Sequence, residues 1–273
     1  MTVAAALAGA RAAGLSTLDA QVLLSRLLGV QRTALITGGD RMLPAGQESR
    51  WAEWCERRTG GEPVAYLLGE KEFHGLMLEV TPDVLVPRPE TELLVAWACE
   101  LAWAMPGPSI VDLGTGSGAI ALALKYRLRD AQLTATDVST TALAVARRNA
   151  ERLRLTIEFV ESAWWAALAG RRFDIVVANP PYIAAGDKHL GALRHEPRLA
   201  LTPGGDGLGA LAAIVAGARA HLSTGGWLLL EHGCDQAEGV RQSLEAAGFQ
   251  ALRTRADLAG HPRASGGQLA GPP

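Results

Sequence analysis

The fold is decided by the run Ser109-Ile-Val-Asp-Leu-Gly-Thr-Gly-Ser-Gly118. Its first five residues, up to Leu113, are mostly apolar and are typical of a buried strand. The three glycines that follow let the backbone turn and approach a ligand closely, and we expect a helix from there to about Arg127. The run therefore predicts a strand, a turn and a helix at the edge of an α/β sheet where ligands bind.

Strands and helices alternate along the rest of the chain. Further strands are expected at Leu133–Thr136, Thr156–Val160, Phe173–Ala178, Gly226–Glu231 and Gln250–Thr254, and helices at Thr140–Arg152, Leu208–Leu222 and Ala237–Ala247. Alternation of this kind implies a mostly parallel, doubly wound sheet, so the fold class is α/β with a Rossmann-like domain. The connection from Ile183 to about Gly207 is longer than most and is a candidate lid.

The N-terminal part has a different pattern. Apolar residues recur with helical spacing over Val3–Ala13, Leu18–Leu28 and Gln47–Arg58, which predicts a small helical bundle. Residues 70–86 alternate in part and predict a β-hairpin. We therefore expect three parts: a helical domain over residues 1–69, a linking hairpin over 70–88 and the Rossmann-like domain over 89–273.

Three shorter stretches give more specific expectations. Trp51 and Trp54 lie three residues apart and share a helix face, which favours core packing, with a docking surface as the alternative. Val86-Pro-Arg-Pro89 stiffens the approach to a helix that starts near Glu90. The Gly- and Pro-rich end, Gly260–Pro273, is expected to be partly loose.

Composition excludes several classes of protein. The 273 residues are 48% hydrophobic and 20% charged, so a sizeable core is available. A net charge of -2 argues against a protein that mainly grips a phosphate backbone, and no apolar run approaches the length of a membrane span. The three cysteines fit no zinc or disulfide spacing and suit a cytoplasmic location.

The glycine run differs from a dinucleotide-binding fingerprint. It reads G-x-G-x-G after an acid, Asp112, whereas the NAD-type pattern is G-x-G-x-x-G. An acid before the loop disfavours a pyrophosphate and favours a cation. Asp137 closes the next strand, where a carboxylate can bind ribose hydroxyls. Together these residues favour a positively charged nucleoside, such as S-adenosylmethionine.

A second polar stretch, Asn179-Pro180-Pro181-Tyr182, follows the strand Phe173–Ala178. The prolines stiffen the turn and remove two donors, so that its carbonyls are expected to point out unpaired. These carbonyls and the Asn179 side chain could hold both hydrogens of a planar NH2 group, and Tyr182 could stack on it. An ordinary strand-ending turn is the alternative for this stretch alone.

No other catalytic chemistry is expected. The six histidines form no ligand pair at helical spacing, so we predict no metal and no Ser/His/Asp nucleophile. His195 and His232 could line the site. Methyl transfer from a sulfonium needs mainly the positioning of two reactants, and we identify no general base.

With these residues in view, the chain resembles the release-factor glutamine methyltransferases. The resemblance covers nearly the whole chain and rests on Gly61–Tyr66, Phe73, Val86–Glu92, Asp112–Gly118, Asn179–Tyr182, Glu196-Pro197 and Gly225–Gly233. It implies a class I methyltransferase domain preceded by a helical domain that helps to dock the substrate. The tetrapeptide alone also occurs in amino-methyltransferases of nucleic-acid bases, which are the rival reading. A non-catalytic cofactor-binding protein is a second rival.

The resemblance also implies roles for individual residues. Contacts to S-adenosylmethionine would come from Gly114, Thr115, Gly116, Ser117, Gly118, Asp137, Asn179 and, beside the adenine, Trp164. The glutamine of a Gly-Gly-Gln loop in a peptide-chain release factor would be held by Asn179, Pro180, Pro181 and Tyr182. We expect a monomer that binds no nucleic acid and no membrane.

Two departures from the family pattern stand out. The family often has an acid where this chain has Ala163, which affects the expected contact to the adenine amino group. The family also ends in an Arg-containing strand that Gly260–Gln268 matches only loosely. This tail contains its own Gly266-Gly267-Gln268, which we interpret as a coincidence rather than as a site of self-methylation.

Overall fold

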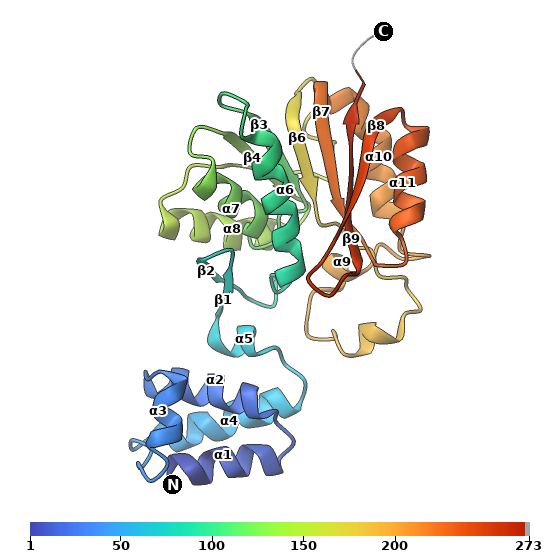
Figure 1. The fold of residues 1–273 in the computed structure, drawn as a ribbon. Coiled ribbons are helices and arrows are strands. Elements are labelled where there is room, and N and C mark those ends of the chain that lie inside the picture. The colour runs from blue at the N-terminus through green and yellow to red at the C-terminus, as the bar shows by residue number, and fades with distance from the viewer. Residues whose placement is uncertain (271–273) are drawn as a thin grey trace. The chain divides into compact units, whose positions relative to one another are not determined.

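The computed structural model describes residues 1–270 and divides into two compact units. The first unit is Met1–Glu70, and the second begins at Lys71 (Figure 1). The division falls inside β1 (Glu70–Phe73), which pairs with β2 (Leu76–Glu79) as the predicted hairpin.

The first unit is a bundle of helices around its own core. Its helices are α1 (Val3–Ala12), α2 (Thr17–Leu28), α3 (Arg32–Thr37), α4 (Gln47–Thr59) and α5 (Val64–Leu68). Thr2 and Ser16 begin α1 and α2, because their side chains accept hydrogen bonds from backbone N–H groups of the first turns. Trp51 and Trp54 are buried in this core, which confirms the packing interpretation. The helices α3 and α5 were not predicted, because six and five residues are too few to show a helical period.

The second unit is built on a seven-stranded sheet with the order β5-β4-β3-β6-β7-β9-β8. The strands are β3 (Ser109–Leu113), β4 (Gln132–Asp137), β5 (Glu158–Glu161), β6 (Phe173–Ala178), β7 (Leu222–Glu231), β8 (Phe249–Ala256) and β9 (Pro262–Leu269). All pairs from β5 to β7 are parallel, and β9 is antiparallel to both of its neighbours. The predicted doubly wound α/β fold is therefore confirmed.

Helices cover both faces of this sheet (Figure 1). They are α6 (Glu92–Ala102), α7 (Ala119–Arg127), α8 (Thr140–Leu153), α10 (Gly209–His221) and α11 (Ala237–Ala246), with short turns η1 (Pro89–Thr91), η2 (Lys188–Gly191) and α9 (Arg198–Leu201). The helix expected near Glu90 thus begins with the single turn η1.

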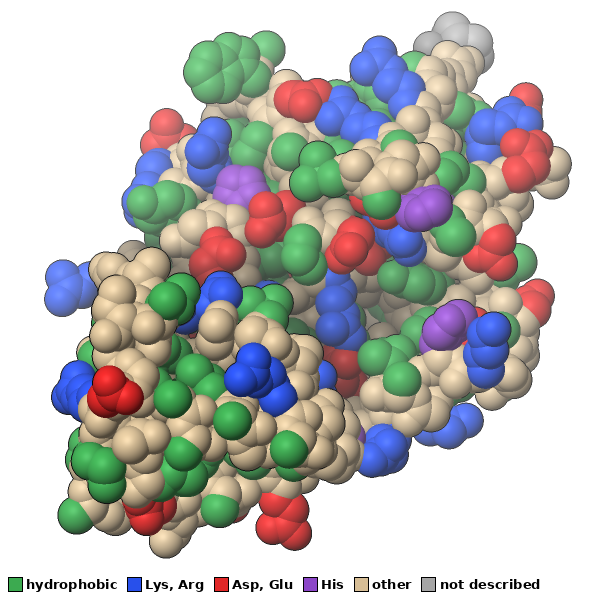
Figure 2. Space-filling model, turned by 60° about the horizontal axis from the view of Figure 1, so that its bottom comes forward, with side chains coloured by type: hydrophobic (Ala, Val, Ile, Leu, Met, Phe, Trp, Pro, Cys, Tyr) green, Lys and Arg blue, Asp and Glu red, His purple; other side chains and the backbone are tan. Residues whose placement is uncertain are grey.

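The surface mixes charges of both signs. On the face shown in Figure 2, Lys and Arg side chains lie among Asp and Glu side chains, with apolar residues between them. This agrees with the near balance of 26 basic and 28 acidic residues. No helix within residues 1–270 is long and apolar enough to cross a bilayer.

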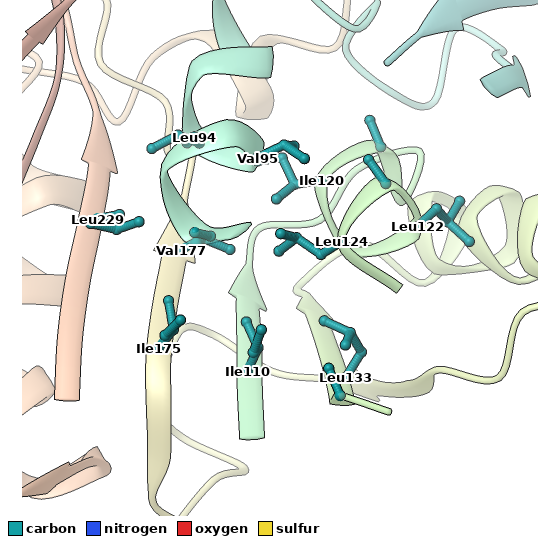
Figure 3. Close-up of a cluster of buried hydrophobic side chains, with 14 of the residues drawn as sticks. Leu94, Val95, Ile110, Ile120, Leu122, Leu124, Leu133, Ile175, Val177 and Leu229 are labelled. Atoms are coloured by element: carbon teal, nitrogen blue, oxygen red, sulfur yellow. The ribbon is translucent and has the colours of Figure 1, made fainter. Parts of the chain in front are cut away.

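The core of the second unit is divided between the two faces of the sheet. Side chains alternate along each strand, so Ile175 and Val177 of β6 pack toward α6 and α7, while Val176 packs with α10 on the opposite face. Figure 3 shows the first of these clusters, with Ile110 of β3 between β4 and β6. Both faces of β6 are buried in this way, which explains why Phe173–Ala178 is an almost continuous apolar run.

The C-terminal segment differs from the prediction. Gly260–Pro273 was expected to be partly loose, but residues 262–269 form β9 between β7 and β8; residues 271–273 lie outside the described part. Gly266 and Gly267 fit there because a Cβ on Gly266 would lie 2.6 Å from Leu229 Cδ2, and one on Gly267 would lie 2.6 Å from Leu252 Cδ2. Composition misled the prediction, since these glycines serve close packing rather than flexibility.

We predict that Gly266→Ala destabilises the protein by about 1–3 kcal/mol, the usual cost of overpacking a core. The added methyl would also lie 2.7 Å from the Leu228 carbonyl oxygen, which is fixed in the sheet. Gly239→Ala is the matched control, because nothing lies within 4 Å of its Cβ position and it is helical; it should be neutral or stabilising. Urea unfolding measures both, and equal midpoints for Gly266→Ala and the parent would contradict the packing argument.

Candidate active site

The candidate site is a cavity of about 350 Å³ in the second unit. This volume is in the range of small-molecule sites. It lies at the carboxyl ends of β3, β4 and β6, where the strand order reverses between β3 and β6. In doubly wound sheets ligands bind at this reversal. Its walls come from residues 83–85, the glycine loop, the turn after β4, residues 162–164, the turn after β6, residues between Pro197 and Pro203, and the first residues of α10.

The three glycines of the loop have different local roles. All have positive φ, which disfavours other residues. Gly114 and Gly116 line the cavity, and a Cβ on Gly116 would point into open space. Gly118 does not line it; its Cβ position is 2.9 Å from Leu122 Cδ1 and 3.2 Å from Ala146 Cβ, so this glycine lets α7 approach α8.

Asp112 lies fully buried beneath the loop. Its Oδ2 accepts hydrogen bonds from Thr115 Oγ1 at 2.6 Å and from the Ala121 amide at 3.3 Å. Its Oδ1 has no hydrogen-bond partner within the described residues. Burial raises the pKa of this carboxyl to about 7. A cation bound above the loop would stabilise the charged form.

Asp137 ends β4 and joins the two turns. Its Oδ2 accepts from the Gly116 amide at 2.9 Å, and its Oδ1 accepts from the Ser139 amide at 2.9 Å. Burial raises its pKa, against these backbone hydrogen bonds. Each oxygen keeps a further lone pair, so the carboxylate can still accept from ligand hydroxyls.

Trp164 forms an aromatic wall beside the glycine loop. Its ring lies 3.4 Å from the position of a Cβ on Gly114, and its backbone has φ 52. The Trp164 carbonyl accepts a hydrogen bond from Ser162 Oγ at 2.9 Å, which holds this strained turn. Ala163 also lines the cavity but brings no polar group.

Asn179 lies at the end of β6 and lines the cavity with Pro181. Its Nδ2 donates to Thr91 Oγ1 at 3.0 Å, which leaves Oδ1 as the end available to a ligand. Pro180 is buried. The Tyr182 carbonyl, which we expected to be unpaired, accepts from Gln236 Nε2 at 2.9 Å, so at this residue the prediction was wrong.

A buried polar cluster lies behind the tetrapeptide. Tyr182 donates its hydroxyl to Glu231 Oε1 at 3.3 Å, and Glu231 is 1% exposed. Burial raises the pKa of Glu231 to about 7, while the hydroxyls of Thr91 and Tyr182 and the charge of Arg263 oppose this shift. His232 is buried next to Glu231, and burial lowers its pKa.

The long connection after the tetrapeptide is folded rather than open. Glu196 is buried within it and accepts from the Val86 amide at 3.0 Å and from Arg88 Nη2 at 2.5 Å. The Ile183 amide also donates to the Leu201 carbonyl at 3.0 Å. The Val86-Pro-Arg-Pro89 segment therefore holds the wall of the cavity that contains Pro197 and Leu199. Its role as a lid stays a prediction.

The structure sorts the predicted site residues into two groups. The cavity is lined by six of them: Gly114, Gly116, Asp137, Trp164, Asn179 and Pro181. Its lining does not include the other seven, which are Thr115, Ser117, Gly118, Pro180, Tyr182, His195 and His232. Thr115 and Ser117 turn inward: the first donates to Asp112, and the Ser117 carbonyl accepts from Asn149.

Sequence reasoning missed two residues that do not line the cavity but hydrogen-bond to the tetrapeptide. Thr91 accepts from Asn179, and Glu231 accepts from Tyr182. Glu231 ends the apolar run Leu228–Leu230, and a charged residue at that position could have been recognised as a functional candidate. Nothing local in the sequence distinguishes Thr91.

Comparison with known proteins identifies the family. The model of the PrmC N-terminal domain matches residues 3–69, and the methyltransferase small domain matches residues 91–247. A Burkholderia pseudomallei protein named release factor glutamine methyltransferase is 52% identical over 96% of this chain and 95% of its own. The chain belongs to the release factor glutamine methyltransferase family. A Pseudomonas aeruginosa protein of the same name is 47% identical over 93% of this chain and 92% of its own.

Solved structures agree with the fold. The T. thermophilus 16S rRNA methyltransferase RsmC, in complex with AdoMet and guanosine, gives a TM-score of 0.57 at 21% identity over 73% of this chain and 49% of its own. A Pyrococcus furiosus methyltransferase gives 0.53 at 19% identity over 81% and 100%. At these identities the similarity supports the methyltransferase fold alone.

The residues present fit the cofactor of this family, S-adenosylmethionine. Gly116 leaves open space for a ligand against the backbone, and Asp112 has an unpartnered buried oxygen below it. Asp137 offers acceptors for ribose hydroxyls, and Trp164 offers an aromatic face for the adenine ring. Acidic groups near the loop match the positive charge of this cofactor.

Cofactor affinity should depend on pH through Asp112. Its pKa is raised to about 7, above that of an unfolded Asp, so the apoprotein loses stability as pH rises toward 7. A cation favours the charged form, so S-adenosylmethionine should bind up to about tenfold more tightly at pH 8 than at pH 6.

Asp112→Asn tests this expectation by calorimetric titration at several pH values. The variant should bind the cofactor more weakly at pH 8 and lose most of the pH dependence. Its apoprotein should melt higher than the parent at pH 8, since a buried charge is gone. An unchanged slope of affinity against pH in the variant would assign the effect to another group.

The Glu196 anchor should contribute to stability. Its side chain is 2% exposed, and Glu196→Ala would leave the Val86 amide and Arg88 without their acceptor, which should cost about 1–3 kcal/mol. Glu158→Ala is the control, because Glu158 pairs with Arg171 but is 55% exposed, and its loss should cost about 0–1 kcal/mol. Urea unfolding compares them, and limited proteolysis should cut the first variant faster within residues 183–207. Equal losses would refute the anchoring role.

Proposed function

We propose that this protein transfers the methyl group of S-adenosylmethionine to the side-chain amide nitrogen of the glutamine in the Gly-Gly-Gln loop of peptide-chain release factors. One observation carries the proposal at the site: Asn179 lines the cavity and donates its Nδ2 to Thr91, while its Oδ1 has no hydrogen-bond partner within residues 1–270. Family membership supports the choice of substrate, because the curated relatives carry this activity in their names.

The chain's own residues position the two reactants. S-adenosylmethionine supplies an activated methyl group on a sulfonium. The glycine loop, Asp112, Asp137 and Trp164 would hold it. Asn179 Oδ1 and a backbone carbonyl of the proline turn would accept the two hydrogens of the substrate amide. A held amide has one direction left for its lone pair, so these residues would present the nitrogen to the methyl group that the bound cofactor would supply.

Hydrogen bonds from the amide hydrogens also lower the barrier. The nitrogen of a neutral amide is a weak nucleophile and becomes positively charged as the new bond to carbon forms. Acceptors that face its hydrogens stabilise this charge more in the transition state than in the ground state. One hydrogen then leaves as a proton, and the product is the N-methyl amide.

The N-terminal unit is proposed to dock the release factor. It has its own core, and its residues 3–69 match the PrmC N-terminal domain. A unit that folds around its own core suits recognition of a large protein substrate better than catalysis.

The rival function, methylation of a nucleic-acid base, has less support. Proteins that act on nucleic acids generally present a basic groove or patch, and basic and acidic side chains are mixed on the face in Figure 2. The solved methyltransferase structures in complex with guanosine or an RNA hairpin share only the fold with this chain, at 21% and 16% identity.

Asn179→Ala should lower kcat by about 100- to 1000-fold, the cost of removing one transition-state hydrogen-bonding group. The assay transfers label from S-adenosylmethionine to a release factor, to that factor with its glutamine replaced, and in parallel to tRNA and DNA. His189→Ala is the control, because His189 is in the same connection but 71% exposed. Label on the intact factor alone supports the proposal; label on nucleic acid, or full activity of Asn179→Ala, would refute it.

A further inference from the structure

The peptide unit that follows the tetrapeptide, between Tyr182 and Ile183, is bound at both ends. Its carbonyl accepts a hydrogen bond from Gln236 Nε2 at 2.9 Å, and its N–H donates to the Leu201 carbonyl at 3.0 Å. A peptide unit is planar, so two bonds to its opposite edges fix the direction of the whole plane. The turn is therefore held from two other segments, the residue that precedes α11 and the end of α9.

The Gln236 side chain can be bound in only one orientation. Its Oε1 accepts from the Gly233 amide at 2.9 Å, while its Nε2 faces the Tyr182 carbonyl. A backbone amide only donates and a carbonyl only accepts, so exchanging the two ends of the carboxamide would set donor against donor and acceptor against acceptor. The Gln236 amide also donates to the Gly233 carbonyl at 2.9 Å, which fixes the main chain from which this side chain extends.

These groups form one chain of hydrogen bonds. It runs from the Gly233 amide through the Gln236 carboxamide and the Tyr182–Ile183 peptide to the Leu201 carbonyl. Every member is an amide that accepts at one end and donates at the other, and hydrogen bonds in such a chain strengthen one another. No member titrates, so this link between α11, the turn and α9 needs no ionised group.

Gly207 packs closely against the same carbonyl. Its φ is 87°, and a Cβ there would overlap the Tyr182 carbonyl oxygen and lie 3.0 Å from the Ala184 nitrogen. The Ala185 amide also donates to the Gly205 carbonyl at 3.0 Å. The two ends of the long connection therefore lie side by side, and the peptide that Gln236 binds is the first one in it.

We propose that Gln236 is a positioning residue: by binding the Tyr182 carbonyl it holds the proline turn in the form that presents Asn179 and the turn carbonyls to the substrate amide. Asn179 and Pro181 line the cavity, whereas Gln236 and Leu201 do not. The two prolines fix their own φ but leave ψ free, so the last peptide of the turn needs a contact from outside to set its direction. This inference rests on the proposed function.

Gln236→Leu tests this role, because leucine is of similar size and makes neither hydrogen bond. It should lower kcat for methylation of the release factor by about 10- to 100-fold, since a small misplacement of the groups that hold a reactant is costly. The Kd of S-adenosylmethionine should stay within about twofold of the parent. Gln242→Leu is the matched control: Gln242 lies in the same helix and donates to Glu238 at 2.8 Å, but it is exposed, so kcat should change less than about twofold.

Gln236→Glu separates positioning from packing. Its carboxylate has no hydrogen to donate to the Tyr182 carbonyl, whereas the protonated acid has one. The kcat of this variant divided by that of the parent should therefore rise at least about threefold from pH 8 to pH 6, while the same ratio for Gln236→Leu stays flat. The ratio removes the titration of neighbouring groups, because both enzymes contain them; they are Tyr182, Glu231, His232, Asp235 and Arg263.

The assay is transfer of label from S-adenosylmethionine to the release factor, and thermal unfolding shows whether each variant is folded under the same conditions. If Gln236→Leu does not fold, the pH profile of Gln236→Glu decides alone. The inference is overturned by a Gln236→Leu enzyme with the parent's kcat, by a loss of cofactor affinity as large as the loss of kcat, or by a flat ratio for Gln236→Glu. A parent enzyme that leaves the glutamine factor unlabelled instead overturns the proposed function, and the inference with it.

Discussion

The reversal of strand order between β3 and β6 is the constraint on which the rest of this molecule depends. Parallel strands all end at one edge of the sheet. Where neighbouring strands follow in order, the turns after them lead in the same direction into the helices and leave no crevice between them. Where the order reverses, the connections diverge, and the turns after β3 and β6 face the same space. The glycine loop and Asn179 therefore meet there, although 60 or more residues separate them in the chain. The apolar strands and helices around them hold this geometry.

Two buried carboxyl groups lie near that edge of the sheet, and burial makes their charged forms unfavourable in the folded protein. Asp112 and Glu231 both have pKa values raised to about 7 by burial, and each keeps an oxygen without a hydrogen-bond partner within the described residues. Natural proteins rarely keep such groups unless they serve a function. Their surroundings differ. Asp112 lies buried below the loop, where a bound cationic cofactor would stabilise its charge, whereas Glu231 is compensated within the protein by Tyr182, Thr91 and Arg263.

The sequence predicts the elements that follow a local period and misses those that depend on distant partners. The strand at Ser109–Leu113 and the helix at Gln47 could be placed because burial on both faces, or on one helical stripe, leaves a direct trace in the residue pattern. The strand β9 could not be placed in this way. Its glycines are required by close packing against Leu229 and Leu252, which are distant in the sequence. The cavity-lining glycines were predictable because they directly follow a strand in a local pattern. Thr91 was not predictable, because its partner Asn179 lies 88 residues further along the chain.

The Gly-Gly-Gln sequence in the tail shows what a substrate loop must provide. Gln268 lies in β9 between two strands, and its Nε2 already donates to the Gly225 carbonyl at 2.8 Å. Gly225 precedes Glu231 on β7 by six residues, so this amide lies about 20 Å along the strand from the site. Transfer requires that both hydrogens of the amide be given to the enzyme and that the nitrogen reach the cavity. A paired amide inside a sheet satisfies neither condition, so Gln268 in β9 is held away from the position that the proposed acceptor needs.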